Sequence, residues 1–442
     1  MKDQRFDLMS RGTVIWLCNL AVVLGVALLA KPVSGQGLPN AKPEQVGFSS
    51  ERLQRLDAAT QQKVDEKQFA GIVTILARHG KVVEFKTYGK KNLATGAPME
   101  KDTVFRIYSM TKPVTGAAMM MLYEEGKWQP DDPISKYVPE FANLKVFKGV
   151  DNSGEPILED PVHPPTMLQL MTHTAGFTYG FFGSTVVDKM YRDQQVLQSA
   201  TLQEMINKLA KIPLLYEPGT RWVYSVSVDI QGYLVEKLSG KSLPDFMRER
   251  IFEPLGMKDT GFYVPKEKMD RLATLYRVSD KNEWAPASPE NDLAPDLSKL
   301  PTKPSGGAGL LSTAPDYLRF AQMLLNGGQL DGVRLLAPPT VKLMTSNHLP
   351  DKLMTGEFGI GLQHIRPGMG FGFDVAVFSD PAQAVDIAGK GTYLWDGAAN
   401  SWFWIDPTDD MTFVGMVQRM GGHGPNMQTF SRAMVFQALV GP

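Results

Sequence analysis

Apolar residues near both ends of the chain recur at the spacing of a helix. Leu53, Leu56 and Val64 fall on one side of an amphipathic helix predicted over residues 50–67. Residues 427–440 are predicted to close the chain as a second helix. Each end of the chain therefore supplies one helix that can cover a sheet.

Strand-like runs lie next to both predicted helices. Residues 71–77 and 82–85 are rich in apolar and β-branched side chains, and a turn containing His-Gly-Lys separates them. Residues 401–406 and 411–417 form a similar pair around Pro-Thr-Asp-Asp. Two such pairs at opposite ends of the chain predict one sheet assembled from both ends.

The middle of the chain shows mostly helical patterning that Pro and Gly interrupt. We therefore expect sheet segments at about residues 45–108 and 346–442, with a helical region at about 109–345 between them. The predicted fold class is α/β of the α+β type, an antiparallel sheet flanked by helices with an inserted helical subdomain. The Pro-rich stretch at residues 293–304 is predicted to be a surface loop.

The composition is that of an ordinary globular protein. The chain has 442 residues, of which 43% are hydrophobic and 21% charged, and its net charge is −1. This balance lacks the basic excess that nucleic-acid binding requires, so no nucleic-acid partner is predicted. The histidines show no metal-ligand spacing, so neither a metal nor another cofactor is expected.

The first part of the chain has the pattern of an export signal. Basic residues precede an apolar run at residues 14–30, and small residues follow it. Residues 1–35 are predicted to be a signal peptide cleaved near Gly35, which leaves a periplasmic or secreted domain of residues 36–442. The alternative is an uncleaved anchor in the inner membrane, because the run approaches the length of a membrane span. The single cysteine, Cys18, lies in this run, so the mature domain has no disulfide and no thiol nucleophile.

A serine and a lysine three residues apart are the first candidates for chemistry. Ser109 and Lys112 lie on the same side of a predicted helix, which brings an amine within reach of a hydroxyl. An adjacent base is what turns an unreactive alcohol into a nucleophile. A capped helix start with a solvated lysine fits the pair equally well when it is taken alone. Pro113 in the first turn and the apolar run at residues 117–122 favour a buried helix.

A tyrosine further along the chain is the candidate for the remaining proton transfer. Tyr224 follows a Pro-Gly turn and precedes a helix-like run at residues 230–238. Acyl transfer needs a group that delivers a proton to the leaving group, and a tyrosine hydroxyl can do so. A single tyrosine is more often a half-buried core residue, so its position alone does not assign it a role.

The order of several short motifs resembles a known superfamily. The chain is similar to the serine β-lactamase-like, penicillin-binding superfamily and most closely to the family VIII carboxylesterases, relatives of class C β-lactamases. The resemblance begins near residue 45 and extends to the end of the chain. It rests on SMTK at 109–112, THTAGF at 172–177, YSV at 224–226, GGAGLLST at 306–313 and WDG at 395–397.

The resemblance implies a role for each catalytic candidate. Ser109 is the expected acylated nucleophile, Lys112 its base and Tyr224 the proton relay to the leaving group. The backbone N–H groups of Ser109 and Ala398 are the expected oxyanion hole. Burial and a helix N-terminus both favour a neutral lysine, and any remaining ammonium charge would favour a phenolate at Tyr224.

Departures from the β-lactamase motifs indicate the class of substrate. Val226 stands where the penicillin-recognising pattern has an asparagine, and an apolar side chain cannot bond a substrate amide. Trp395, Asp396 and Gly397 replace Lys-Thr-Gly, so an acid stands near the position of a cation and is expected to repel a carboxylate. The Trp-x-Gly form is that of the family VIII esterases. These replacements favour ester cleavage over lactam cleavage.

The sequence therefore predicts a serine hydrolase that cleaves small carboxylic esters through an acyl-enzyme on Ser109. Phe177 and Tyr179 lie in an aromatic, glycine-containing loop and are candidates for the wall of the acyl pocket. The alternatives are a β-lactamase or D-Ala-D-Ala carboxypeptidase, or an acylated sensor domain without turnover, and weak β-lactamase activity fits the main prediction too. A Ser-His-Asp mechanism through His173 is disfavoured because no Gly-x-Ser-x-Gly occurs. The predicted partner is a small ester, and the oligomeric state stays open.

Overall fold

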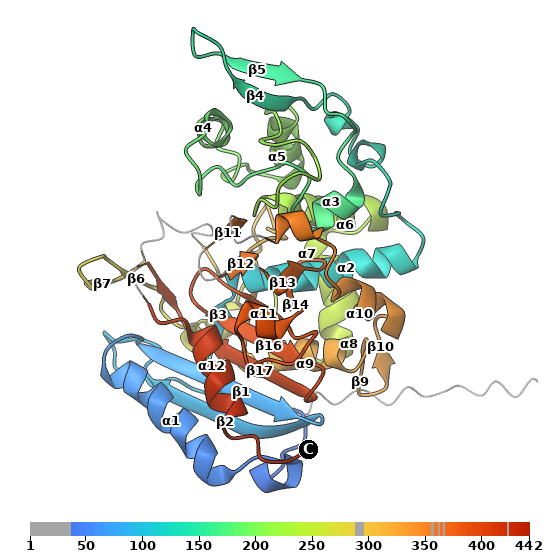
Figure 1. Ribbon diagram of the computed structural model, residues 1–442. Coiled ribbons are helices and arrows are strands. Elements are labelled where there is room, and N and C mark those ends of the chain that lie inside the picture. Colours follow the sequence, from blue (N-terminus) through green and yellow to red (C-terminus); the bar gives the residue numbers. More distant parts are fainter. Residues whose placement is uncertain (1–36, 288–295, 355–357, 361–362, 366, 422–423) are drawn as a thin grey trace, which may run out of the picture. The chain divides into compact units, whose positions relative to one another are not determined.

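The predicted sheet joins the two ends of the chain (Figure 1). A computed structural model describes residues 37–287, 296–354, 358–360, 363–365, 367–421 and 424–442. Within them the main sheet has seven strands in the order β13, β14, β15, β16, β17, β1 and β2, and each neighbouring pair is antiparallel. The strands span, in that order, Met369–Phe371, Ala376–Phe378, Tyr393–Asp396, Trp402–Asp406, Met411–Met416, Gly71–Arg78 and Lys81–Gly89.

One pair of strands that are far apart in sequence joins the N-terminal and C-terminal parts of this sheet. β1 pairs with β17, where Ile75 lies opposite Val414. Every residue of β1 and of β17 is buried, so helices must cover both faces of the sheet there. The covering helices are α1 (Ser50–Asp65), α12 (Met427–Phe436) and α9 (Ala314–Leu325). The predicted antiparallel sheet flanked by helices is confirmed.

The last helix is shorter than its sequence pattern predicts. α12 ends at Phe436, four residues before the predicted end at residue 440. Leu439 forms a β-bridge with Phe48, and the backbone N–H of Val440 donates to Gly47 at 2.8 Å. These backbone contacts with residues 47 and 48 replace the last helical turn.

The middle of the chain is helical, as predicted, and it also contains short strands. Its other helices are α2 (Thr111–Glu124), α3 (Met167–Met171), α4 (Val186–Asp193), α5 (Leu202–Leu209), α6 (Ser227–Ser239), α7 (Leu243–Met247), α8 (Glu253–Leu255) and α10 (Pro338–Met344). The strands there are β3 (Phe105–Arg106), β4 (Val146–Val150), β5 (Pro156–Glu159), β6 (Tyr276–Val278), β7 (Trp284–Pro286), β8 (Leu311–Ser312), β9 (Gln329–Leu330) and β10 (Val333–Arg334). Most of these strands are too short to show a two-residue period, which explains why the sequence pattern missed them.

Smaller elements complete the C-terminal part of the chain. They are β11 (Phe358–Ile360), β12 (Gln363–Ile365), α11 (Pro381–Ala384) and β18 (Arg419–Met420). Part of the predicted loop at 293–304 falls outside the described residues, and the part from residue 296 onward contains no helix or strand.

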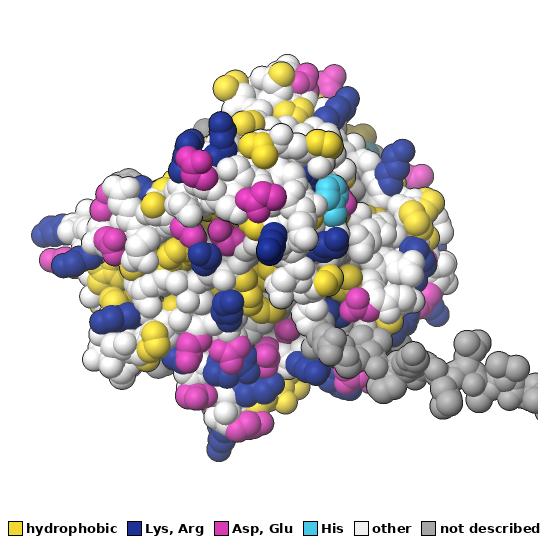
Figure 2. Space-filling model, turned by 90° about the horizontal axis from the view of Figure 1, so that it is seen from below, with side chains coloured by type: hydrophobic (Ala, Val, Ile, Leu, Met, Phe, Trp, Pro, Cys, Tyr) yellow, Lys and Arg dark blue, Asp and Glu magenta, His cyan; other side chains and the backbone are white. Residues whose placement is uncertain are grey.

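The predicted signal segment, residues 1–35, lies outside the described residues. Among the residues that are described, no helix has the length and apolar character needed to cross a membrane. Figure 2 shows acidic and basic side chains interspersed on the face that it presents, which gives that face no field of a single sign. Export and the lack of a nucleic-acid partner stay predictions.

Candidate active site

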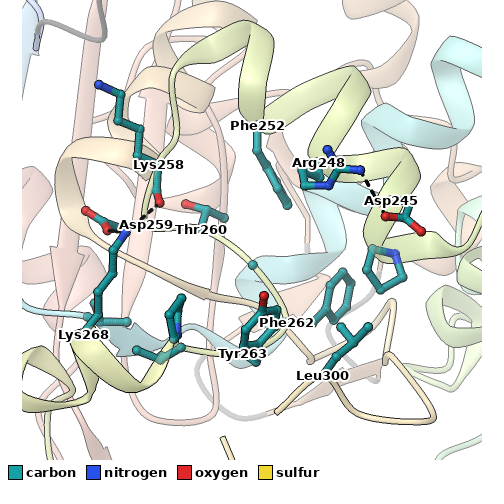
Figure 3. Close-up of a pocket in the computed structure, with 15 residues that line it drawn as sticks. Asp245, Arg248, Phe252, Lys258, Asp259, Thr260, Phe262, Tyr263, Lys268 and Leu300 are labelled. Atoms are coloured by element: carbon teal, nitrogen blue, oxygen red, sulfur yellow. Dashed lines mark hydrogen bonds and ion pairs between the residues drawn. The ribbon is translucent and has the colours of Figure 1, made fainter. Parts of the chain in front are cut away.

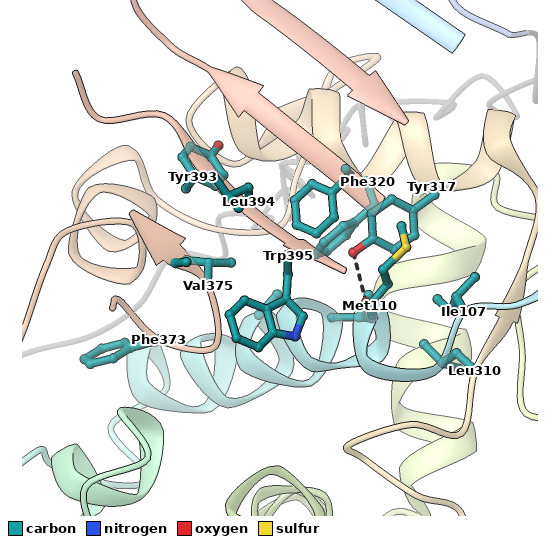
Figure 4. Packing of buried hydrophobic residues seen from close by; sticks show 14 of the residues in the cluster. Ile107, Met110, Leu310, Tyr317, Phe320, Phe373, Val375, Tyr393, Leu394 and Trp395 are labelled. Carbon is teal, nitrogen blue, oxygen red and sulfur yellow. Dashed lines mark hydrogen bonds between the residues drawn. The ribbon is translucent and has the colours of Figure 1, made fainter. Parts of the chain in front are cut away.

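Ser109 lies in a single 3₁₀ turn, Tyr108–Met110, immediately before α2. The sequence pattern predicts that the helix opens at the serine, whereas α2 begins two residues later at Thr111. Tyr108 has φ of +44°, a left-handed conformation that packing must hold in a bulky residue. Figure 4 shows the packing of its neighbours Ile107 and Met110, with the Tyr317 hydroxyl donating to the Met110 carbonyl at 2.9 Å.

Lys112 is close enough to Ser109 to take its proton. The Lys112 Nζ lies 3.2 Å from the Ser109 Oγ and donates to the Gly307 carbonyl at 2.8 Å. The side chain is fully buried, and burial lowers the pKa of Lys112 to about 8, against the opposing charges of nearby aspartates. A minority of the amine is therefore neutral near physiological pH, far more than for an exposed lysine, and the neutral form is the one that accepts a proton.

The pKa of Lys112 predicts the pH dependence of activity. If Lys112 is the base, kcat/KM for an uncharged ester should rise about tenfold per pH unit below the pKa of about 8 and level off above it. The sign follows because the amine must be unprotonated when it accepts the serine proton. Initial rates with p-nitrophenyl butyrate across this range, corrected for spontaneous hydrolysis, give the profile. A profile that is flat or falls through this pH range contradicts the assignment.

Tyr224 completes the set in its protonated form. Its hydroxyl is hydrogen bonded to the Ser109 side chain, and its ring centroid lies 4.5 Å from the Lys112 Nζ. Burial raises the pKa of Tyr224, although hydrogen bonds to the side chains of Ser109 and Trp395 oppose the shift. This differs from the expectation that a lysine charge favours a phenolate. Tyr224 is therefore a phenol that can donate a proton, which is consistent with the prediction that Lys112 is the base.

Gly397 brings the predicted oxyanion donor to the nucleophile. Residues 397–401 form a tight turn after β15, in which the Gly397 N–H donates to the Ser401 carbonyl at 2.7 Å. A Cβ on Gly397 would lie 2.3 Å from the carbonyl oxygen of Ile107. This close backbone approach sets the end of β15 against the turn that carries Ser109. Ala398, the next residue, lines the same cavity as Ser109.

Replacing Gly397 with alanine should impair catalysis more than folding. The new Cβ collides with the Ile107 backbone and displaces Ala398, so we expect kcat to fall about 100-fold, as for loss of one oxyanion donor. The measurement is kcat with p-nitrophenyl butyrate, together with a thermal melt. Gly261→Ala is the matched control, since the nearest atom to its Cβ is 3.8 Å away. An unchanged kcat in Gly397→Ala contradicts this role.

A cavity of about 370 Å³ opens at these residues. It brings together four of the predicted site residues: Ser109, Tyr179, Tyr224 and Ala398. Its other lining residues are Tyr108, Phe181, Phe182, Leu197, Asp229, Arg277, Lys303, Ser305, Ala308 and Met420. Aromatic and apolar side chains therefore form much of the wall, with charged groups from several loops among them.

The remaining predicted residues do not line this cavity. Phe177 is buried and packs on the Phe141 ring, with centroids 5.5 Å apart. Val226 is fully buried at the start of α6, so its side chain faces the interior and not a substrate. Both placements differ from the expectation of substrate contact. The aromatic wall comes instead from Phe181 and Phe182, whose side chains are about half exposed.

The motif at residues 395–397 supports the site without lining the cavity. Trp395 is buried, and its ring lies 5.5 Å from the ring of Tyr224. Its carbonyl accepts a hydrogen bond from Gln428 at 3.0 Å, which ties β15 to α12. Asp396 and Gly397 do not line the cavity either, although the charge of Asp396 acts on Lys112. Trp395 therefore positions Tyr224 by packing.

His173 has a structural role in this arrangement. It is buried with φ of +57°, and its Nδ1 lies 3.1 Å from the Ser225 Oγ. Burial lowers the pKa of His173, so the ring is neutral. Its ring packs against Tyr224 with centroids 5.1 Å apart. The histidine thus supports the Tyr224 loop.

Several lining residues were not candidates on the sequence. Asp229 lies five positions after Tyr224 in the first turn of α6, which is the one local hint that it faces the site. Arg277, Lys303 and Met420 come from separate loops and short strands that no local pattern connects. Only the folded chain places them together.

A second cavity lies elsewhere and has about 300 Å³. It shares no lining residue with the catalytic cavity. Figure 3 shows its aromatic wall, with charged groups already in ion pairs, such as Lys268 with Asp259 and Arg248 with Asp245. None of the predicted site residues lies there. Across the described residues, no cluster of three or more His, Cys, Asp or Glu side chains is arranged to hold a metal ion.

Known proteins resemble this chain in sequence and in fold. A model of the Beta-lactamase family matches residues 56–434. Protein Rv1367c of Mycobacterium tuberculosis (strain ATCC 25618 / H37Rv) is 34% identical over 385 residues, covering 86% of this chain and 92% of the relative. Esterase EstB of Burkholderia gladioli is 32% identical over 366 residues, covering 79% and 86%. The solved structure of EstCE1, a hydrolase with promiscuous acyltransferase activity, aligns with a TM-score of 0.74 at 29% identity, covering 87% of this chain and 99% of that one.

Proposed function

Because the chain belongs to the Beta-lactamase family, we propose that it is a serine carboxylesterase that cleaves small carboxylic esters through an acyl-enzyme on Ser109. Its fold and its esterase relatives make it a serine ester hydrolase. The finer proposal rests on one observation. The buried Lys112 Nζ lies 3.2 Å from the Oγ of Ser109, which lines a cavity together with Tyr224 and Ala398.

The first half of the proposed reaction forms the acyl-enzyme. The Ser109 Oγ attacks the ester carbonyl carbon while its proton passes to the Lys112 Nζ. The negative oxygen of the tetrahedral intermediate accepts hydrogen bonds from the backbone N–H groups of Ser109 and Ala398. When the intermediate collapses, the Tyr224 hydroxyl gives a proton to the leaving alcohol. The Lys112 ammonium then restores the Tyr224 proton.

The second half releases the acid. A water molecule loses a proton to the Lys112 amine and attacks the acyl carbonyl carbon, while the carbonyl oxygen lies in the same oxyanion hole. Collapse of this intermediate returns the proton to the Ser109 oxygen and frees the carboxylic acid. No cofactor enters either half.

The side chains that line the cavity support an ester substrate. Its wall carries aromatic and apolar side chains such as Phe181, Phe182 and Met420, which suit an apolar acyl or alcohol group. Val226 does not bear on the class of substrate, because its side chain faces the interior. Trp395 and Asp396 do not line the cavity and act on Tyr224 and Lys112 instead.

The test is a comparison of p-nitrophenyl butyrate with nitrocefin under the same conditions. We expect sustained hydrolysis of the butyrate and slow or no cleavage of nitrocefin. Fast nitrocefin cleavage with poor butyrate turnover favours a β-lactamase and contradicts the proposal. A burst equal to the enzyme concentration without further turnover favours an acylated sensor and contradicts it too.

Export is a separate proposal, supported by the basic and apolar pattern of residues 1–35. We expect the chain recovered from outside the cytoplasm to begin near residue 36. Mass spectrometry of the exported protein gives its first residue directly. A chain that retains residues 14–30 and sediments with membranes favours the anchor instead.

A further inference from the structure

Asp229 lies at the active site and has no part in the reaction as written above. It is the third residue of α6 (Ser227–Ser239), is 5% exposed and lines the catalytic cavity. An acid in the first turn commonly stabilises its own helix. Here the Oδ1 instead accepts from the Ser305 hydroxyl at 2.5 Å and from the Gly307 N–H at 3.3 Å. The carboxylate therefore binds a segment distant in sequence.

The segment that Asp229 binds is held between two helices. Gly306 approaches α6 so closely that a Cβ on it would lie 2.5 Å from the Val228 carbonyl oxygen. From α2, the Thr115 hydroxyl donates to the Gly306 carbonyl at 2.7 Å. The next carbonyl, that of Gly307, accepts from the Lys112 Nζ at 2.8 Å. Segment 305–307 thus connects Asp229 on α6 with Lys112 on α2.

We infer that Asp229 is a positioning residue, which holds segment 305–307 so that the Gly307 carbonyl fixes the Lys112 amine toward Ser109, and whose charge acts on that amine. The inference rests on the proposed function, in which Lys112 is the base. A lysine side chain has several rotatable bonds, and one N–H held by a carbonyl restricts where its lone pair points. With that N–H donated to Gly307, the lone pair of the neutral amine is left for the serine proton.

Asp229 is also the main charge that opposes the burial of Lys112. Three acids act on the amine: Asp229 from α6, Asp374 from the turn between β13 and β14, and Asp396 at the end of β15, with the effect of Asp229 the largest. Burial raises the pKa of Asp374 well above its ordinary range, which disfavours the charged form of this acid. Asp396 is partly exposed, so solvent screens its charge. The other titratable groups facing the amine, which burial keeps neutral, are His173, Tyr179 and Tyr224.

Two variants separate the charge of Asp229 from its hydrogen bonds. Asp229→Asn keeps the size and one acceptor oxygen but removes the charge. We expect the acid limb of the kcat/KM profile to move about one pH unit lower, since a favourable charge near the amine is lost. Ser305→Ala keeps the charge but removes one hydrogen bond to Asp229. We expect kcat to fall about fivefold, with the limb unmoved.

The matched control is Asp316→Asn. Asp316 is also the third residue of its helix, α9, and is also buried, but it binds the Asp259 N–H and the Thr260 hydroxyl. We expect a lower melting temperature for this variant and no shift of the limb. An unmoved limb in Asp229→Asn, or an unchanged kcat in Ser305→Ala, overturns the inference.

A second readout distinguishes failure of this inference from failure of the proposed function. The rate at which a fluorophosphonate probe labels Ser109 depends on the same base but needs no ester turnover. A labelling limb that shifts in Asp229→Asn supports the inference even if no ester is hydrolysed. Ester hydrolysis with an unmoved labelling limb upholds the esterase and overturns the role of Asp229.

Discussion

Replacing Ser109 with alanine should lower ester turnover by about 10⁴-fold or more, to a rate close to that of the uncatalysed reaction. The reason is that the Ser109 hydroxyl lies beside the Lys112 amine, whereas the other cavity serine, Ser305, donates its hydroxyl to Asp229. Lys112 itself is fully buried, and Tyr224 is held as a phenol. The measurement is kcat with p-nitrophenyl butyrate. Mass spectrometry of the wild type during turnover should show an acyl group on the peptide that contains Ser109, and the variant should show none.

The control for this prediction is a serine outside the site. Ser153 lies in the exposed turn between β4 and β5, where its hydroxyl donates to Asp151. Ser153→Ala should retain wild-type turnover. Ser109 lines a cavity and packs in no core cluster, so Ser109→Ala should melt close to the wild-type temperature. Retention of more than about a tenth of the wild-type rate by a folded Ser109→Ala contradicts the assignment.

Replacing Lys112 with methionine should have the next largest effect, a loss of about 10³-fold in kcat. Methionine is similar in length and apolar, so it fills the buried site but cannot take the serine proton. We expect the acid limb near pH 8 to disappear with the amine that causes it. The measurement is kcat across the pH range, with circular dichroism to confirm that the variant is folded.

A double variant sharpens the second prediction. The double variant Ser109→Ala, Lys112→Met should be no slower than Ser109→Ala alone, because the effects of replacing residues that act in one step are not additive. Lys127→Met, in the exposed turn after α2, is the control and should leave kcat unchanged. A Lys112→Met enzyme with an intact pH limb contradicts the assignment of the base, and additive effects contradict a shared step.

Three contacts tie the site to the rest of the fold. The Ile107 carbonyl lies against Gly397, the Gly306 carbonyl accepts from Thr115 of α2, and the Met110 carbonyl accepts from the Tyr317 hydroxyl. Each contact joins α2 or the turn that carries Ser109 to a different part of the chain. Packing of rigid elements therefore sets the distances on which proton transfer depends.

Elements with long, regular patterns can be predicted from the amino-acid sequence. The helix at Ser50–Asp65 and the strands at Gly71–Arg78 and Met411–Met416 were predictable because apolar spacing reports directly on local periodicity. The proximity of Ser109 and Lys112 was also predictable, because residues three apart in a helical turn are neighbours. The order of the short motifs indicated the family to which the chain belongs.

Which side chains line the cavity depends on the packing of the whole fold. Val226 and Phe177 lie within or near motifs, yet both point into the core, while Tyr179, two residues after Phe177, lines the cavity. Lys303 and Asp229 reach the same cavity from segments more than seventy residues apart. A local pattern shows that a side chain is apolar or charged. The direction in which it points depends on how distant elements pack, because burial and hydrogen bonding are satisfied by the whole fold.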